Sequence, residues 1–291
     1  MTDLATVPIE PVLSERKAVR RENWRLIRRR PTFIIGVIIL TFWVLCAILG
    51  TRIAPRDPYN YFTVPYVRPR PSFPFGTDQT GRDVLSRVLV GARDVLKTAP
   101  PAAFLGVLAG VILGLFMGYF GRWFDTVAGR IVEALLSLPT ILIGLLAVTT
   151  LGRSTGVVIA VVATLFTPIV ARTVRAAVIA ERDLDYVVSA KLRGESSMFI
   201  MFREILPNIW GPIIVELTIR VGYAIFVIAT LSFLGAGPKP PSAEWGAQVS
   251  DTYRDIQSGF WWTTIFPALA IASLVIAVNL IADAVQSVVE A

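Results

Sequence analysis

Glu216 and Arg220 are charged side chains inside an otherwise apolar run of the sequence. Residues four apart lie on one face of a helix, so these two charges can form an ion pair. A lone charge in a membrane-spanning helix is costly, which favours pairing. Two interpretations stay open: a structural ion pair near the inner half of the span, or charged groups that face a cavity and meet a zwitterionic solute.

The residue sets that common enzymes use are missing from the sequence. It contains no histidine, which removes the commonest metal ligand and general base. It has no G-x-x-x-x-G-K-[ST] segment to cradle a nucleotide phosphate. The single cysteine, Cys46, excludes a disulfide within the chain. We therefore expect a chain that is not an enzyme and that holds no metal or cofactor.

A charged stretch, YVVSAKLRGESSMFIMFREILPN from Tyr186 to Asn208, separates two long apolar runs. Good helix formers fill residues 172–192, and Gly194 is well placed to end this helix in a left-handed conformation. Ser196 or Ser197 then caps a short second helix that runs to Ile205. This predicts a helix–turn–helix at the membrane surface to which another protein binds. Its basic side chains are diluted by acidic ones, so we expect no nucleic acid as a partner.

The elements around these residues are apolar helices. The chain has 291 residues, of which 54% are hydrophobic and 17% charged, against about 25% charged in soluble domains. Uncharged windows of about 19 residues indicate membrane spans. We predict an all-α membrane protein with six spans, at about 32–51, 98–120, 134–152, 154–171, 208–234 and 257–283. The first run lacks a small-residue cleavage site and is interpreted as a retained span, not a signal peptide.

Basic residues set the expected orientation. Eight precede the first span: Arg16, Lys17, Arg20, Arg21, Arg25, Arg28, Arg29 and Arg30. The positive-inside rule then places both termini in the cytoplasm, with anionic lipid headgroups as the neighbours of these charges. The predicted parts are a cytoplasmic N-terminus (1–31), the first span (32–51), an extracytoplasmic segment (52–97), a core (98–285) with the charged loop 172–207, and a cytoplasmic C-terminus (286–291).

Small and helix-breaking residues predict how the spans pack. Gly106, Gly110, Gly114 and Gly118 recur every four residues, so one helix face allows another backbone to approach closely. We expect this face to pack within the chain; a subunit interface is the alternative. Pro139, Pro168, Pro212 and Pro267 fall inside or near later spans and predict kinks.

The segment before the second span has its own helical pattern. Thr80 with Asp83 forms a plausible capping box. Val84, Leu85, Val88 and Leu89 then follow at helical spacing. This predicts an amphipathic helix that lies on the outer membrane face.

Several motifs together resemble one family. The spacing from Val188-Ser189-Ala190 to Gly194 and on to Leu206-Pro207 resembles the EAA loop of bacterial ABC importer permeases, although Val188 stands where Glu is usual and Ser189 replaces the first Ala. FGTDQTGRDVLSRVLVGAR (75–93), GYFGRWFD (118–125), ALLSLP (134–139) and LSFLGAGPKPPSAEWG (231–246) are similar to the dipeptide/oligopeptide/nickel permease family, in particular its C-type subunit. The resemblance covers about residues 25–285.

The resemblance implies a type I ABC importer permease fold and two functional surfaces. A cytoplasmic coupling helix would dock on an ATPase through Tyr186, Val188, Ser189, Ala190, Lys191, Gly194, Glu195, Ser196, Arg203 and Pro207. An extracytoplasmic rim would dock a substrate-binding protein through Gly76, Thr77, Asp78, Gly81, Arg82, Asp83, Trp245 and Gly246.

The implied function is uptake of dipeptides or oligopeptides across the bacterial inner membrane. The implied partners are a homologous B-type permease, two ABC ATPases that hold ATP and Mg, and the binding protein. Nickel or a nickel chelate is the alternative substrate within the family. A secondary transporter driven by an ion gradient is the rival from another class; it would favour inverted repeats and intramembrane carboxylates.

Overall fold

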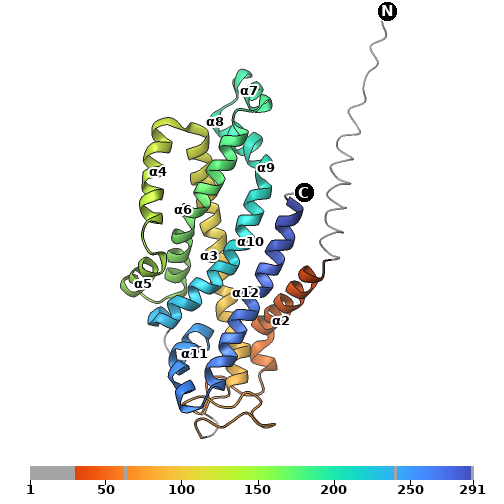
Figure 1. Ribbon diagram of the computed structural model, residues 1–291, viewed down its shortest axis with the longest axis vertical. Coiled ribbons are helices and arrows are strands. Elements are labelled where there is room, and N and C mark those ends of the chain that lie inside the picture. The colour runs from red at the N-terminus through yellow and green to blue at the C-terminus, as the bar shows by residue number, and fades with distance from the viewer. Residues whose placement is uncertain (1–29, 62–63, 239–240, 290–291) are drawn as a thin grey trace, which may run out of the picture.

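The computed structural model describes residues 30–61, 64–238 and 241–289, a bundle of long helices (Figure 1). The predicted basic N-terminus therefore lies outside the described residues except for its last two residues. The helices are α2 (Pro31–Ile53), α3 (Val84–Phe120), α4 (Arg122–Leu136), α5 (Thr140–Leu151), α6 (Thr155–Glu181), α7 (Asp185–Leu192), α8 (Ser197–Phe199), η1 (Ile200–Ile205), α9 (Leu206–Asn208), α10 (Trp210–Leu231), η2 (Ser232–Ala236), α11 (Trp245–Thr252), η3 (Tyr253–Ser258) and α12 (Trp262–Val289).

Five helices of the described chain are long and apolar enough to cross a membrane: α2, α3, α6, α10 continued by η2, and α12. The third predicted span, 134–152, is not one straight helix. It is divided between α4 and α5, which meet at an angle of 87°. Pro139 precedes α5 in an extended conformation, and a proline cannot continue the hydrogen-bond ladder of the helix before it. The pair counts as a sixth, broken span or as a re-entrant loop.

The second span begins earlier than the sequence suggested. α3 is one helix of 37 residues, about 55 Å long at 1.5 Å per residue, so it exceeds the bilayer core of about 30 Å. Its first turns are the segment predicted to lie on the membrane surface. That prediction is wrong, because Val84, Arg87 and Val88 are buried inside the protein. The expected capping box is also wrong: Asp83 itself is the N-cap, and its carboxylate accepts a hydrogen bond from the N–H of Ser86.

The four glycines of α3 pack against α6 of the same chain. A Cβ atom at Gly110 would lie 2.5 Å from the Cβ of Val170, and one at Gly114 would lie 2.7 Å from the backbone oxygen of Ala171. Gly106 and Gly118 meet α6 in the same way, at Ala163 and Val178. The absence of side chains on this face thus brings two long helices into backbone contact over three turns.

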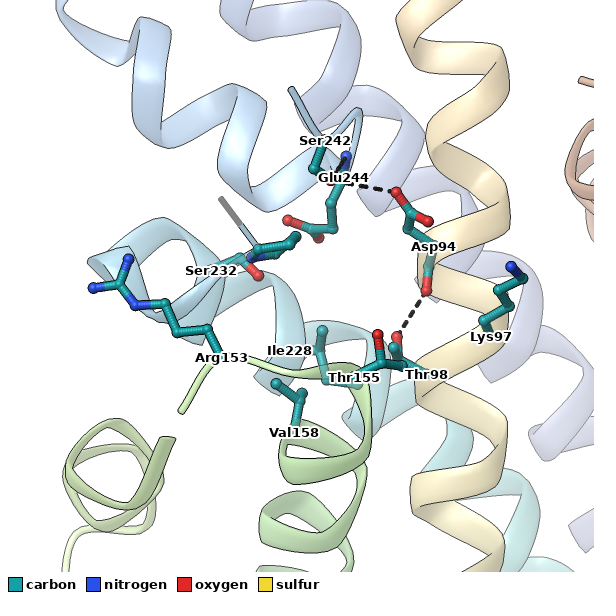
Figure 2. Close-up of a pocket in the computed structure, with 11 residues that line it drawn as sticks. Asp94, Lys97, Thr98, Arg153, Thr155, Val158, Ile228, Ser232, Ser242 and Glu244 are labelled. Carbon is teal, nitrogen blue, oxygen red and sulfur yellow. Dashed lines mark hydrogen bonds between the residues drawn. The ribbon is translucent and has the colours of Figure 1, made fainter. Parts of the chain in front are cut away.

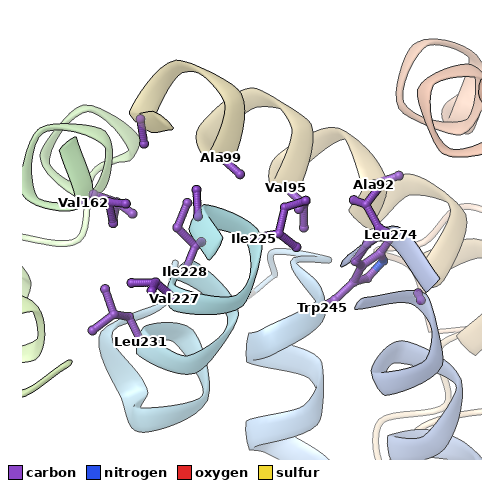
Figure 3. Packing of buried hydrophobic residues seen from close by; sticks show 14 of the residues in the cluster. Ala92, Val95, Ala99, Val162, Ile225, Val227, Ile228, Leu231, Trp245 and Leu274 are labelled. Atoms are coloured by element: carbon purple, nitrogen blue, oxygen red, sulfur yellow. The ribbon is translucent and has the colours of Figure 1, made fainter. Parts of the chain in front are cut away.

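Two ends of the bundle are used below as reference points. The α7 end carries α7 and α8, and the α11 end carries α11 and the segment 64–83 (Figure 1). A core of buried side chains fills the half near α11, where α3, α6, α10, α11 and α12 meet (Figure 3). Arg30 at the start of α2 donates a hydrogen bond to Ser287 near the end of α12. The start of α2 therefore lies beside the end of α12.

Candidate functional site

The predicted helix–turn–helix is present at the α7 end, although its first helix is interrupted. α6 ends at Glu181, and α7 starts at Asp185 after an extended residue, Leu184. Side chains stabilise the break: Lys191 Nζ donates to the backbone oxygen of Arg182 at 3.1 Å, and the Tyr186 hydroxyl donates to Glu181. Burial and this hydrogen bond raise the pKa of Tyr186 to about 12, so its hydroxyl remains a donor.

Gly194 makes the turn between the two helices. Its φ is +79°, the left-handed conformation that the sequence predicted. The N–H of Gly194 bonds to the oxygen of Lys191 at 3.0 Å, and the N–H of Glu195 bonds to the oxygen of Ala190 at 3.2 Å. These two bonds form a Schellman motif. Ser196 then caps α8 by accepting a hydrogen bond from the N–H of Phe199.

Most residues of the predicted coupling surface are exposed. Val188, Ser189, Lys191, Gly194, Ser196, Arg203 and Pro207 are exposed, Tyr186 and Glu195 are partly buried, and Ala190 is buried. Ala190 instead belongs, with Val187 and Ile200, to an apolar cluster that joins the hairpin to α3 and α6. The predicted residues therefore divide into two groups: an exposed outer face, and Ala190, which anchors the hairpin to the bundle.

Two exposed leucines next to this surface were missed by the sequence analysis. Leu184 is 46% exposed and Leu192 is 83% exposed, and Val188 lies between them at 40%. Val188 and Leu192 are four residues apart on one face of α7, and Leu184 is the extended residue that precedes this helix. An exposed apolar stripe on a charged hairpin is typical of a protein-binding surface. The four-residue spacing was the available sequence signal.

Glu216 and Arg220 form the ion pair that their spacing predicted. Arg220 Nε lies 2.8 Å from Glu216 Oε2. The other oxygen of Glu216, Oε1, accepts a hydrogen bond from the Thr173 hydroxyl of α6 at 2.9 Å. Glu216 is 9% exposed. The carboxylate thus links α10 to α6, which is the geometry of a structural ion pair.

The residues predicted for the docking rim lie at the α11 end, but their side chains do not face outward. Asp78 is 5% exposed and Arg82 is 7% exposed; they pair at 2.7 Å. Thr77, Asp83 and Trp245 are fully buried, and the three glycines at positions 76, 81 and 246 are buried as well. Charged residues are rarely buried unless they are paired. These residues therefore hold the α11 end together from inside.

Trp245 shows how this end is built. Its indole Nε1 donates to the backbone oxygen of Val88 at 2.8 Å, which ties α11 to α3. Arg87 donates to backbone oxygens of Pro58 and Ser242. Two segments far apart in the sequence are thereby fixed to the first turns of α3.

A cavity of about 160 Å³ opens between α3, the start of α6, η2 and the segment before α11 (Figure 2). Asp94 and Glu244 form one wall. Glu244 is 3% exposed and caps α11 by accepting hydrogen bonds from the N–H groups of Gly246 and Ala247. Burial raises the pKa of Glu244 to about 7. The sequence analysis did not select these two acids, because nothing in their spacing brings position 94 to position 244.

Comparisons with known proteins identify the family. Residues 110–291 match the model for the binding-protein-dependent transport system inner membrane component. Residues 20–69 match the model for the N-terminal TM domain of oligopeptide transport permease C. The chain belongs to this family of permeases. It is a multi-pass inner-membrane ABC importer permease of the peptide type.

Two relatives show how far the similarity extends. A putative peptide transport system permease protein of Brucella suis is 36% identical over the whole chain and 94% of the relative. The glutathione transport system permease protein GsiD of Escherichia coli is 38% identical over 92% of this chain and 89% of GsiD. Membership of this family overturns the secondary-transporter alternative.

Proposed function

We propose that this permease forms a pathway for dipeptides or oligopeptides together with a homologous second permease. Two cytoplasmic ATPases hold ATP and Mg and drive the transport, and an extracytoplasmic binding protein delivers the peptide. The hairpin of α7 and α8 docks on one of the ATPases. ATP binding closes the ATPases, moves the hairpin and switches the pathway between its inward-facing and outward-facing states.

The single observation that supports the coupling role best is the construction of the hairpin. Its inner face is anchored to α3 and α6 by buried Val187, Ala190 and Ile200, while Leu184, Val188 and Leu192 on its outer face are exposed. A rigid anchor with an apolar outer stripe is suited to transmit a push from a partner. One hairpin contacts one ATPase, so two nucleotide sites require a second permease.

Peptide is the proposed substrate because the Brucella suis relative is named for peptide transport and GsiD of Escherichia coli for glutathione transport. Nickel is the competing substrate. Within the described residues, no group of three His, Cys, Asp or Glu side chains is placed to hold a metal ion, although a binding protein can select a substrate for which the permease has no ligands.

The test is co-purification followed by reconstitution. The tagged permease is purified from its own host with whatever ATPases, second permease and binding protein accompany it, and the complex is placed in liposomes. We expect uptake of labelled dipeptides that depends on ATP and on the binding protein. Purification without an ATPase contradicts the coupling role, and ATP-dependent uptake of nickel but not of dipeptides contradicts the peptide assignment.

A further inference from the structure

The cavity of Figure 2 has three kinds of lining, each from a different part of the chain. One wall carries the carboxylates of Asp94 from α3 and Glu244 from the start of α11. Another wall is apolar, with Val158 of α6 and Ile228 of α10. Lys97 and Arg153 lie at the edge, both exposed.

Among the described residues, the two acids of this wall have no cation in direct contact, although Lys97 and Arg93 lie close enough to Asp94 to interact with it electrostatically. Neither Asp94 nor Glu244 forms an ion pair within the described residues. Figure 2 shows the charged ends of Lys97 and Arg153 directed away from the two acids. Asp94, together with a Glu244 side chain that is only partly ionised near pH 7, attracts a cation, because the interaction is screened less in a confined space than in bulk water.

Asp94 has a free oxygen for such a cation. Its Oδ2 accepts a hydrogen bond of 3.3 Å from the Ser242 hydroxyl. The Thr98 hydroxyl bonds to the backbone oxygen of Asp94, not to the carboxylate. Oδ1 of Asp94 accepts no hydrogen bond from the described residues. Glu244, in contrast, already uses both oxygens on the N–H groups that begin α11.

The size of the cavity limits what it can hold. Its volume of about 160 Å³ is smaller than the roughly 300–1,000 Å³ of sites that enclose a drug-sized ligand. It therefore fits one end of a peptide, not a whole one. A terminal ammonium group beside an aliphatic side chain has the chemistry that the acidic and apolar walls complement.

We propose that this cavity is a subsite of the permease for the amino-terminal residue of a peptide, with Asp94 as the residue that binds the ammonium group and Val158 and Ile228 as the contacts for the first side chain. The inference rests on the proposed peptide transport and deepens it. It makes the permease itself, and not the binding protein alone, selective for a free amino terminus.

The experiment measures direct binding, so that the binding protein does not contribute. The complete complex of both permeases and the ATPases is placed in nanodiscs without the binding protein. Binding of labelled Ala-Phe is then competed with unlabelled Ala-Phe or with propionyl-Phe, which lacks only the amino group. We expect the wild-type complex to bind Ala-Phe about tenfold or more tightly than propionyl-Phe, because a charge-assisted hydrogen bond is lost.

Two variants and one control locate the effect. Asp94→Asn keeps the shape of the side chain and is expected to reduce the preference to less than about twofold. Thr155→Trp fills the cavity from an exposed position without a charge change and is expected to abolish binding of both compounds. Asp251→Asn removes an exposed acid that does not line the cavity, and it is expected to keep the wild-type preference. Thermal stability of each complex confirms that it is folded.

The results separate the two proposals. Absence of binding-protein-dependent uptake of any peptide overturns the proposed function. If uptake occurs but the wild-type complex binds both compounds equally or not at all, the subsite is overturned and the function stands. A tenfold preference that persists in Asp94→Asn also overturns the subsite.

Discussion

Arg182 donates a hydrogen bond from Nη1 to the backbone oxygen of Gly118 at 2.7 Å. Gly118 lies in the last turn of α3, where the backbone oxygens have no partner within the helix. Arg182 follows the end of α6, and its own backbone oxygen accepts a hydrogen bond from Lys191 of α7. These bonds join the hairpin, α6 and α3 at one point, so movement of the hairpin is transmitted directly to the longest helix of the bundle.

We predict that Arg182→Gln uncouples transport from ATP hydrolysis. The variant loses a charge-assisted hydrogen bond of about 1.5–3 kcal/mol, so the hairpin keeps only its apolar contacts with α3 and transmits less of its movement to that helix. Peptide uptake per ATP hydrolysed is expected to fall roughly tenfold, measured in proteoliposomes. Asp183→Asn is the matched control, because Asp183 is exposed and only contacts the same arginine from outside. Equal coupling ratios in Arg182→Gln and wild type would show that this bond carries no signal.

Gly194→Val is expected to have a similar effect for a different reason. A Cβ atom at this position meets no atom within 4 Å, so the cost is one of conformation alone. For a residue with a side chain, the left-handed region costs about 1–2 kcal/mol, and a β-branched residue is worse still. The turn then changes shape and presents the hairpin wrongly to the ATPase. ATP hydrolysis and uptake are measured together.

Gly194→Asn serves as the control, since asparagine tolerates the left-handed region. It is expected to retain most of the wild-type uptake. Wild-type uptake by a Gly194→Val variant that reaches the membrane at a normal level refutes the assignment of this hairpin as the coupling element.

Local features could be predicted from the sequence because neighbouring residues determine them. The left-handed Gly194 and the cap at Ser196 depend on a few adjacent residues, and the apolar runs reveal most spans. The burial of Asp78 and Arg82 could not be predicted, since it depends on segments that are distant in the sequence. The same holds for the start of α3, whose apolar stripe predicted a helix on the membrane surface. Arg87 lies inside the protein instead, where backbone oxygens of Pro58 and Ser242 accept its hydrogen bonds. Pro139 predicted a kink, but the sequence did not predict that α4 and α5 would meet at 87°.

The close packing of α3 on α6 leads to a prediction about stability. Gly110→Ala places a Cβ atom 2.5 Å from the Cβ of Val170, which is closer than two carbons can approach. Overpacking of this kind costs about 1–3 kcal/mol, so we expect a lower melting temperature in detergent. Gly129→Ala is the control, because its Cβ would meet only a flexible methionine at 3.9 Å. The double variant Gly110→Ala with Val170→Gly removes both clashing atoms of Val170, Cβ and Cγ1. In the Val170→Gly background, Gly110→Ala is therefore expected to lower the melting temperature much less than it does in the wild type; an equal loss would show that the clash is not the cause.

Glu216→Gln is expected to lower stability more than Thr173→Val. Loss of the carboxylate leaves Arg220, whose side chain is 12% exposed, charged without its partner, at a cost of about 2 kcal/mol or more. Thr173→Val removes one hydrogen bond and leaves the ion pair, at a cost of about 1 kcal/mol. Thermal unfolding in detergent measures both.

The swap Glu216→Arg with Arg220→Glu separates the two interpretations of this pair. Recovery of stability with an unchanged preference among charged dipeptides is the expected result, and it identifies an ion pair within the helix. A changed charge preference in Glu216→Gln, with the melting temperature of the wild type, would instead place the pair on the pathway.

Glu244 predicts a pH dependence of stability. Its pKa in the folded protein is about 7, above the ordinary value of 4.5, because burial disfavours the charged carboxylate. The folded state therefore binds more protons than the unfolded state between these two values, and the group's contribution to stability falls as the pH rises from 4.5 to about 7. Glu244→Gln lacks this titration. The melting temperature of the wild type minus that of the variant is expected to decrease across this window and to stay constant above about pH 8.

Glu133→Gln is the matched control, since it makes the same chemical change at a side chain that is 73% exposed. The comparison of the two variants isolates the effect of burying Glu244. The comparison is informative whichever protein is more stable overall, because the prediction concerns how the difference between the two proteins changes with pH and not its sign. Parallel melting curves for wild type and Glu244→Gln from pH 4.5 to about 8 would mean that Glu244 keeps its charge when buried, held by the N–H groups at the start of α11.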